Sequence, residues 1–430
     1  MQRHGMIHIV NDKECCGCGA CSQACPAGCI SMHPSREGFL YPVIDESACI
    51  GCGKCEKVCP MRRRNPWRQP SCVIAAASRD DHDREDSSSG GMFTELAKKV
   101  LGAGGVVYGV SFDCEWNPVP CRAENVNELS AIRRSKYAQA DMSPVFRDCL
   151  DALNSGREVL FSGTPCQISG LNGFLGRNYP NLVLVDVVCH SVPSPAVWKR
   201  YLAEIPEHHE GYEVFRGSSE RTYNLSCRHR DNPFMKAFLQ GLISRPSCAD
   251  CPFRGGASSA DITLGDFWGI DRLKPDLSAE CGWNAVVIHS DKGMKLISSL
   301  DIVSIPSSLD EASMYNSALV KSPLPSVRRG TFFDSFEGAR SVTELMRSLV
   351  SGPSMKQRLQ RMKSSFRAIL KGENHRAAAG TAPGRKERAR VECCLESGEY
   401  SITGVSFRDK SSGWKDYRMT IAIKLNDSAR

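Results

Sequence analysis

The chain has 430 residues, of which 41% are hydrophobic, 24% charged and 7% aromatic, the balance of an ordinary protein with two or three domains. Its net charge of +7 is modest, and no base-stacking motif or zinc-finger spacing accompanies it, so nucleic acid is not expected as a partner. The unusual feature is 22 cysteines. No signal-like segment opens the sequence, and no apolar run reaches the roughly 18 residues that cross a bilayer. We therefore expect a cytoplasmic protein, without membrane insertion, whose thiols bind metal.

Eight cysteines near the N-terminus form two runs, 15–26 and 49–60, each spaced C-x2-C-x2-C-x3-C and followed by proline. This is the spacing of bacterial two-cluster ferredoxins, in which the fourth cysteine of each run ligates the other cluster. A zinc site would stop at four ligands. We expect a two-[4Fe-4S] ferredoxin domain over 1–65, with one cluster on Cys15, Cys18, Cys21 and Cys59 and the other on Cys25, Cys49, Cys52 and Cys55. Cys16 and Cys29 lie outside the pattern.

After a stretch predicted to be a linker, 66–86, helical and strand-like runs alternate. Helices are predicted at 92–105, 145–156 and 166–176, and strands at 106–112, 158–163 and 181–188. The expected fold is therefore an α+β ferredoxin domain followed by an α/β core (87–340) with a largely parallel sheet. Ligands of such sheets bind beyond the carboxyl ends of the strands, where Cys166 and Cys189 lie.

Cys248 and Cys251 form a lone C-x2-C pair, which is a weak signal. The pair fits zinc, a redox disulfide or a cluster. A cluster needs two more thiolates, and the loops carrying Cys166 and Cys189 could converge on it. Cys166 could also be a buried small hydrophobe.

Six segments in order resemble the beta-subunit family of coenzyme F420-reducing hydrogenases and dehydrogenases, over roughly 87–340. They are SSSGGMFTELAKKVLGAGGVVYGVSFD, RRSKYAQADM, VLFSGTPCQISGL, VDVVCHSVPSPAVWKRYL, RPSCADCPFRG and DITLGDFWGI. Bacterial members often carry an N-terminal two-cluster ferredoxin. The resemblance implies FAD and a third [4Fe-4S] cluster inside the α/β domain, with Cys166, Cys189, Cys248 and Cys251 as ligands. Two features depart from the family: Ser191 stands where glycine is more frequent, and the segment 405–419, usually central, lies at the C-terminal end.

No dinucleotide fingerprint or Walker A run is present, so the flavin must be held in another way. Candidate cofactor-binding residues are Ser89, Gly90 and Gly91, before a helix whose amides could meet a diphosphate, together with Lys136, Gly163 and Thr164. Ser89 could equally be a helix cap. His190 is the candidate catalytic residue, as a proton relay, with a hydrogen-bonded structural histidine as the alternative. Asp266 could hold the flavin or a turn.

The predicted function is an FAD-dependent iron–sulfur oxidoreductase that passes electrons between [4Fe-4S] clusters and a small-molecule two-electron substrate. Its expected partner is an electron donor or acceptor protein, such as ferredoxin or a hydrogenase or dehydrogenase subunit. A flavin is the expected converter between single electrons and pairs. The alternative is a non-catalytic electron-relay or redox-sensing protein, which the two departures from the family favour.

The C-terminal part is predicted to hold helices over 341–370, including an amphipathic helix at 354–370, and a linker over 371–392. Two alternating runs around Gly413 predict a β-hairpin within 393–430. Because a lone hairpin is marginal in water, we expect it to fold back beside 205–232 and dock on the α/β domain.

Overall fold

The structure is a computed structural model that describes residues 7, 11–62, 67–204, 214–216, 221–223, 227–228, 232–277, 282–350, 400–406 and 420–425. The chain divides into two compact units, Met1–Gly352 and Pro353–Arg430. Among the described residues, no helix is long and apolar enough to span a membrane.

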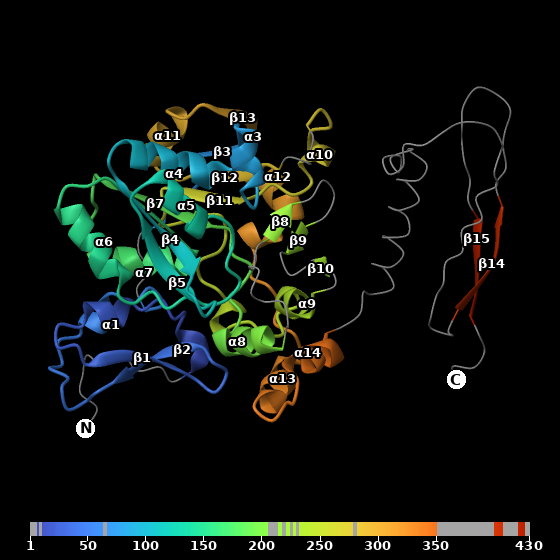
Figure 1. Ribbon diagram of the computed structural model, residues 1–430, viewed down its shortest axis with the longest axis horizontal. Helices are drawn as coiled ribbons and strands as arrows, with labels where there is room; N and C mark the ends of the chain where they lie inside the picture. The colour runs from blue at the N-terminus through green and yellow to red at the C-terminus, as the bar shows by residue number, and fades with distance from the viewer. Residues whose placement is uncertain are drawn as a thin grey trace. The chain divides into compact units, whose positions relative to one another are not determined.

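The first unit is built around an eight-stranded sheet with the order β13-β3-β12-β11-β7-β6-β4-β5 (Figure 1). Its strands are β3 (Cys72–Ser78), β4 (Val106–Phe112), β5 (Pro118–Ala123), β6 (Val159–Gly163), β7 (Leu182–Val187), β11 (Ile262–Asp266), β12 (Asn284–Ile288) and β13 (Ile302–Ser307). Neighbours are parallel from β4 through β6 and β7 to β11, and the strands outside these four pair antiparallel. The predicted α/β core with a largely parallel sheet is confirmed in this four-stranded centre.

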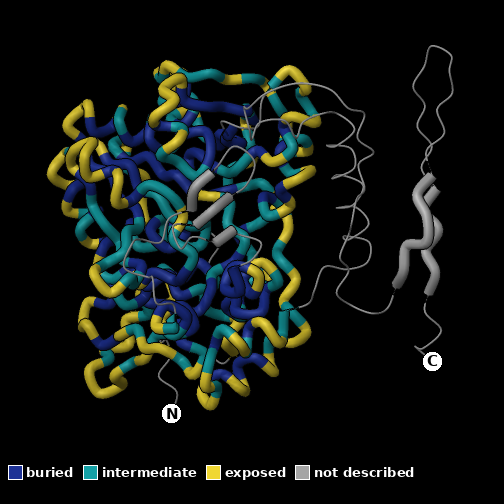
Figure 2. The backbone as a smooth tube through the Cα atoms, turned by 45° about the vertical axis from the view of Figure 1, so that its right-hand side comes forward, coloured by how far each residue is buried: buried dark blue, intermediate teal, exposed yellow. Residues whose placement is uncertain are grey.

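Different helices cover the two faces of the sheet, because alternate residues of a strand point to opposite faces. Tyr108 and Phe161 pack with α6 (Val145–Asn154) and α7 (Pro165–Leu175) on one face. Val107 and Leu160 pack with α4 (Met92–Gly102) and α11 (Asp291–Ser298) on the other. The most deeply buried backbone in Figure 2 follows these strands and the helices on them.

Further helices connect the strands or cap the ends of the sheet. They are α3 (Asp81–Glu85), η2 (Val126–Glu128), α5 (Leu129–Ile132), α8 (Pro195–Ala203), α9 (Pro233–Leu239), η4 (Pro246–Cys248), α10 (Ile270–Leu273), α12 (Leu309–Tyr315), η5 (Ser317–Leu319), α13 (Arg329–Phe336) and α14 (Val342–Leu349). The last two pack with α8 and α9 around Trp198 and Phe234 in a separate apolar cluster. β8 (Val214–Arg216), β9 (Arg221–Tyr223) and β10 (Cys227–Arg228) form a small antiparallel sheet.

The sequence predicted the central helices and strands correctly but missed the first strand of the large sheet. α4, β4, α6, β6, α7 and β7 all lie within the predicted segments or one residue outside them. The linker predicted at 66–86 is wrong, because β3 pairs there with β12 and β13 inside the sheet and α3 follows it. The apolar run of β3, VIAAA at 73–77, is short and lies between charged segments. The composition of these flanking segments indicated a linker rather than a strand.

The N-terminal part packs against the edge of the α/β core within the same unit, below the sheet in Figure 1. It contains η1 (Asp12–Glu14), α1 (Ala20–Ala24), the antiparallel pair β1 (Ile30–Pro34) and β2 (Leu40–Ile44), and α2 (Lys54–Lys57). α1 lies against α7, where glycines permit the close approach. A Cβ added at Gly170 would lie 2.8 Å from Cys18 Sγ, and one at Gly173 would lie 2.3 Å from the Val58 carbonyl oxygen.

The second unit contains the predicted hairpin, in which β14 (Tyr400–Ser406) pairs antiparallel with β15 (Thr420–Leu425). Its expected docking beside 205–232 stays a prediction. The amphipathic helix expected at 354–370 and the linker expected at 371–392 lie outside the described residues.

Candidate functional site

A cavity of about 460 Å³ lies at the carboxyl ends of the parallel strands, within the size range of ligand pockets. Gly163 and Thr164 reach it from the end of β6, Val188 from the end of β7 and Asp266 from the end of β11. This is the edge at which open α/β sheets bind ligands. The loop after each central strand therefore supplies part of one site.

Most of the residues predicted to hold a flavin line this cavity. Those that do so are Ser89, Gly91, Lys136, Gly163 and Thr164, and the candidate catalytic residue His190 lines it as well. Gly90 does not: a Cβ there would lie 2.7 Å from the Ala76 carbonyl oxygen, so this glycine permits close packing on the sheet. The sequence thus identified the walls of the cavity but not each residue's part in it.

Ser89 and Lys136 bond to backbone carbonyls in this structure. Ser89 is buried and its hydroxyl donates to the Trp283 carbonyl at 2.8 Å. The alternative that Ser89 caps α4 is wrong, because the N-cap is Gly91 and the Met92 amide donates to Asn284 Oδ1 at 3.1 Å. Lys136 Nζ donates to the Ala131 carbonyl at 2.8 Å and to the Arg133 carbonyl, which closes the end of α5.

The four cysteines of the α/β domain form one wall of the cavity. Cys166 lies in the first turn of α7, after the N-cap Thr164, whose Oγ1 is 3.2 Å from its Sγ. Burial and the neighbouring Cys166 thiol together raise the pKa of Cys248 to about 12. Burial, followed by the Cys166 thiol, likewise raises the pKa of Cys251. For Cys189, burial raises the pKa and Cys248, Cys166 and Cys251 add to it.

These mutual effects mean that the four thiols are neighbours, brought together from three separate segments. As buried thiolates the four cysteines would repel one another unless positive charge lay between them. The donor set therefore suits the positively charged iron–sulfide core of a cluster. Among the described residues, no three His, Cys, Asp or Glu side chains have the spacing of a single-ion site. In a four-iron cluster each cysteine binds a different iron atom, so its ligands need not converge on one point.

The N-terminal cysteines influence one another across the two runs, and their crossed ligation stays a prediction. Burial, Cys15 and Cys59 together raise the pKa of Cys21 to about 12, although Cys59 belongs to the other run. Cys29 lies beside the second group, with its Sγ 3.3 Å from Cys25 Sγ and Cys49 among the thiols that raise its pKa. Gly19 and Gly53 adopt the left-handed conformation at the same place in each run, just before α1 and α2.

Cys16 joins the two regions, a role that its place outside the repeat did not reveal. The Cys166 and Cys18 thiols both influence the pKa of Cys16, so its thiol lies close to both. Cys16 also lines the cavity. This side chain therefore lies near cysteines of both regions.

Several buried polar atoms around the cavity have no hydrogen-bond partner within the described structure. They are Ser88 Oγ, Arg133 Nε, His190 Nε2, Arg254 Nε and Asn316 Oδ1. Leaving such groups unpaired costs about 1–3 kcal/mol each, but these atoms are covered by protein and do not reach the space of the cavity. The residues that line the cavity include the basic Arg133, Arg134 and Arg254. A cavity with this lining fits an anionic cofactor such as a flavin nucleotide.

His190 follows Cys189 and its ring stands edge-on to Phe238, with centroids 5.2 Å apart. Burial lowers its pKa, and the Arg254 charge lowers it further. The Arg254 guanidinium also donates to the His190 carbonyl at 2.9 Å. Both effects favour the neutral ring, and its Nε2 has no hydrogen-bond partner among the described residues.

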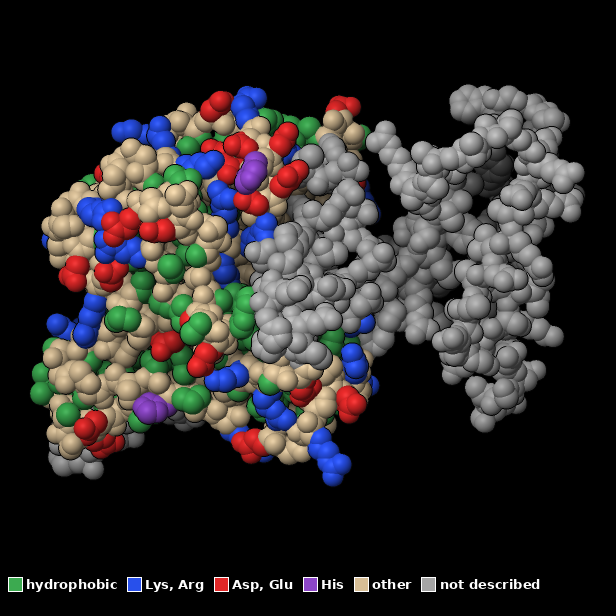
Figure 3. All heavy atoms as spheres, viewed as in Figure 1, with side chains coloured by type: hydrophobic (Ala, Val, Ile, Leu, Met, Phe, Trp, Pro, Cys, Tyr) green, Lys and Arg blue, Asp and Glu red, His purple; other side chains and the backbone are tan. Residues whose placement is uncertain are grey.

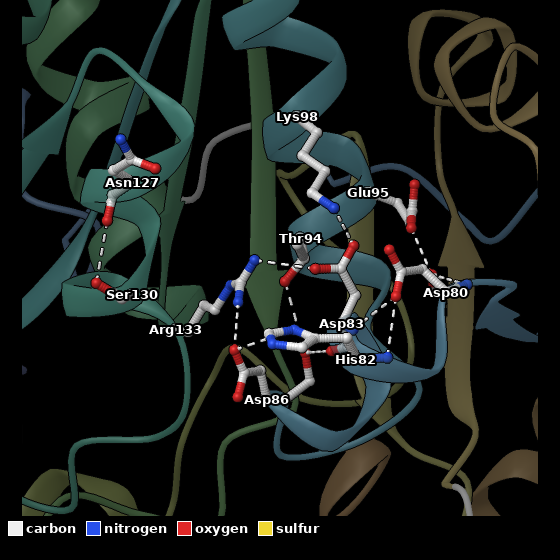
Figure 4. Close-up of polar contacts among 12 residues, drawn as sticks. Asp80, His82, Asp83, Asp86, Thr94, Glu95, Lys98, Asn127, Ser130 and Arg133 are labelled. Carbon is white, nitrogen blue, oxygen red and sulfur yellow. Dashed lines mark hydrogen bonds and ion pairs between the residues drawn. The ribbon is translucent and has the colours of Figure 1, made fainter.

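A network of charges fixes two loops of the cavity (Figure 4). The buried Asp83 carboxylate accepts from Lys98 and, at 3.0 Å, from Arg133 Nη2. Arg133 Nη1 binds Asp86 at 2.9 Å, and Arg134 Nε donates to the Asp86 carbonyl at 2.9 Å. The network holds the serine loop 87–89 and the basic loop 133–136 against each other. On the face shown in Figure 3, charges of both signs are interspersed, with no large field of one sign.

The fold and cysteine sets are those of a two-cluster ferredoxin joined to an α/β redox domain. Residues 73–147 and 156–303 match the family models for the N-terminal and the C-terminal part of the "Coenzyme F420 hydrogenase/dehydrogenase, beta subunit", together just over half of the chain. Residues 14–62 and 41–98 match two models of a "4Fe-4S dicluster domain". The chain belongs to the coenzyme F420 hydrogenase/dehydrogenase beta-subunit family.

One solved structure similar to this chain is a chain of the F420-reducing [NiFe] hydrogenase complex from Methanosarcina barkeri. It is 16% identical, with a TM-score of 0.43, over 65% of this chain and 97% of that chain. A comparison with curated proteins found no match.

Proposed function

We propose that this iron–sulfur member of the family is an oxidoreductase that carries electrons between the N-terminal pair of [4Fe-4S] clusters and a small two-electron substrate. A third [4Fe-4S] cluster on Cys166, Cys189, Cys248 and Cys251 and FAD in the adjoining cavity complete the path. One observation carries the proposal: the four thiols line the same cavity at the carboxyl ends of the parallel strands, and Cys16 lies close both to Cys166 and to the ferredoxin residue Cys18.

A bound flavin supplies the exchange between single electrons and electron pairs. The chain's own residues bind and orient it. Arg254, Arg133 and Ser88 line the cavity and are the proposed donors to its anionic and polar groups. The ion pairs of Arg133 with Asp83 and Asp86 hold one of these donors in place.

His190 is proposed to hold or move a proton at Nε2. Its depressed pKa keeps the imidazole neutral near pH 7, so this nitrogen can accept a proton without a prior change of state. The buried position of Nε2 excludes bulk water as the competing partner. His190→Gln keeps hydrogen-bonding capacity but removes proton exchange, and should slow turnover while leaving flavin content unchanged.

The decisive test is anaerobic purification followed by iron, sulfide and flavin analysis. The proposal predicts yellow-brown protein with about 12 iron atoms and releasable FAD, reducible by a ferredoxin-type donor and reoxidised by a small molecule. About eight iron atoms with no flavin would contradict it and favour an electron relay without a substrate of its own. A matched Cys114→Ser variant, at an exposed cysteine, should retain full iron content.

A further inference from the structure

Arg245 is a deeply buried arginine at the junction between the N-terminal part and the α/β core. Its side chain is 1% exposed. Nε donates to the Cys15 carbonyl at 2.8 Å, Nη2 to the Leu40 carbonyl at 2.9 Å and Nη1 to Gln139 Oε1 at 3.0 Å. Within the described part of the chain, every acceptor that it is seen to use is neutral.

A buried guanidinium with only neutral acceptors is costly, because the charge has left water without meeting an opposite charge. Arginine also stays protonated in proteins, so it cannot relieve the cost by losing its proton. The Phe39 and Tyr41 rings, at 5.5 and 4.2 Å from its central carbon, stabilise the cation only in part. A further negative group is therefore expected beside it.

The two nearest candidates are the cysteine sets on either side. Arg245 bonds directly to the carbonyl of Cys15, and a Cβ added at Gly17, within the first cysteine run, would lie 2.8 Å from its Nη1. On the other side, its own carbonyl accepts from the Cys248 amide at 3.1 Å, in the turn that presents that thiol. A cluster held by four thiolates is anionic and becomes one charge more negative when it takes up one electron.

We propose that Arg245 raises the reduction potential of the cluster on Cys15, Cys18, Cys21 and Cys59 and of the third cluster, and so keeps both reducible although they are buried. The inference rests on the proposed function for the third cluster only. A fixed positive charge stabilises the reduced, more negative state of each cluster more than its oxidised state. The cysteines proposed for the remaining cluster, Cys25, Cys49, Cys52 and Cys55, include the exposed Cys52, so solvent should screen this cluster more and Arg245 should affect it less.

The test is an EPR-monitored redox titration of the full chain with all clusters loaded. Arg245→Gln removes the positive charge and should lower the reduction potential of one or two clusters by about 59 mV. For a one-electron couple, this corresponds to a roughly tenfold change in the equilibrium constant in favour of the oxidised cluster. A remaining couple should stay in place as an internal reference. Gln139→Glu is nearly isosteric and places a carboxylate on Arg245, so it should shift the same couples in the same direction.

Arg329→Gln is the matched control, because Arg329 also bridges the two regions but has its own carboxylate partner, Glu37. It should leave all couples unchanged even where it lowers stability. Unshifted couples in both Arg245→Gln and Gln139→Glu, or an equal shift in Arg329→Gln, would overturn the inference. If Arg245→Gln fails to load clusters, Gln139→Glu decides alone. An iron content of about eight in the unchanged protein would count against the third cluster, and the Cys15 couple would still decide the role of Arg245.

Discussion

The N-terminal part takes its cluster cysteines from two short runs with the same spacing, whereas the α/β domain collects its four from three loops between Cys166 and Cys251. In the first region each run carries its own backbone geometry, with Gly19 and Gly53 in the left-handed conformation before a short helix. In the second region the sheet provides the geometry, because parallel strands deliver their loops to one edge. The first site is local, and the second exists only when the whole domain has folded.

The same contrast extends to the surroundings of the two cysteine sets. The second N-terminal group includes Cys52, which is exposed, and the adjacent Ile50 is 68% exposed. The α/β cysteines instead line a cavity that is also lined by basic side chains. One region therefore suits electron exchange with an external protein, and the other suits binding of a small molecule.

The largest expected effect separates the two regions by their iron. Cys248→Ser should remove about four of about 12 iron atoms and leave the two N-terminal clusters, because their cysteines belong to a separate site. Cys55→Ser should have the converse effect on the N-terminal pair. Iron analysis with EPR checks both variants. Loss of all iron on replacing Cys248 would mean that the regions are not independent.

The second prediction concerns the contact between the two regions. Gly173→Ala places a Cβ 2.3 Å from the Val58 carbonyl oxygen, so α7 and the ferredoxin part must separate. We expect a loss of about 1–3 kcal/mol in the free energy of unfolding, although alanine favours a helix. Thermal denaturation measures it. Gly102→Ala, where a Cβ meets nothing within 4 Å, is the control and should be neutral or stabilising.

The contrast between the two regions also explains what the sequence could predict. Crossed ligation is predicted from spacing alone, and Cys21 lies close to Cys59 of the other run. The cavity was located because β6 and β7 are short, largely apolar strands of a parallel sheet, and Cys166 and Cys189 follow their carboxyl ends. In contrast, Cys16 and Arg245 acquire their partners only across the junction of two regions, and no local pattern marks such a contact.

Individual roles within the cavity were predicted less well than its location. Ser89 stands where a helix cap was plausible, but Trp283, far along the chain, offers its carbonyl and takes the hydroxyl. Lys136 has the charge to bind a phosphate, yet its ammonium group donates to the backbone carbonyls of Ala131 and Arg133, just before its own position in the chain. In both cases a backbone carbonyl competes for the donor, and only the fold decides which acceptor is near.

The third prediction compares two ion pairs that cross the same junction. Glu37 and Arg329 are 21% and 16% exposed and bind through two contacts, whereas Arg36 and Glu337 are both 61% exposed and lie 3.4 Å apart. Glu37→Gln should cost about 1–2 kcal/mol, between the values of exposed and fully buried pairs. Glu337→Gln should cost less than about 0.5 kcal/mol. Chemical denaturation distinguishes them, and equal losses would contradict the burial argument.

The smallest expected effect is a pH dependence confined to the α/β core. Thr263 Oγ1 donates to the Asp186 carboxylate and lies 2.9 Å from His289 Nε2. Burial raises the pKa of Asp186 to about 6, against hydrogen bonds from Ser258 and Thr263 that lower it. Burial also lowers the pKa of His289 to about 4, against a hydrogen bond with the Arg68 backbone that raises it.

The two groups act in opposite directions. Between about pH 6.5 and 4, His289 is protonated in the unfolded chain but not in the folded chain. Lowering the pH through this range therefore destabilises the fold. Between about pH 6 and 4, the folded chain holds a proton on Asp186 that the unfolded chain releases, so acid stabilises it. Asp186→Asn should therefore increase, and His289→Gln decrease, the loss of stability between pH 7 and 5, each by about 1 kcal/mol. Parallel pH profiles for both variants would contradict the assignment.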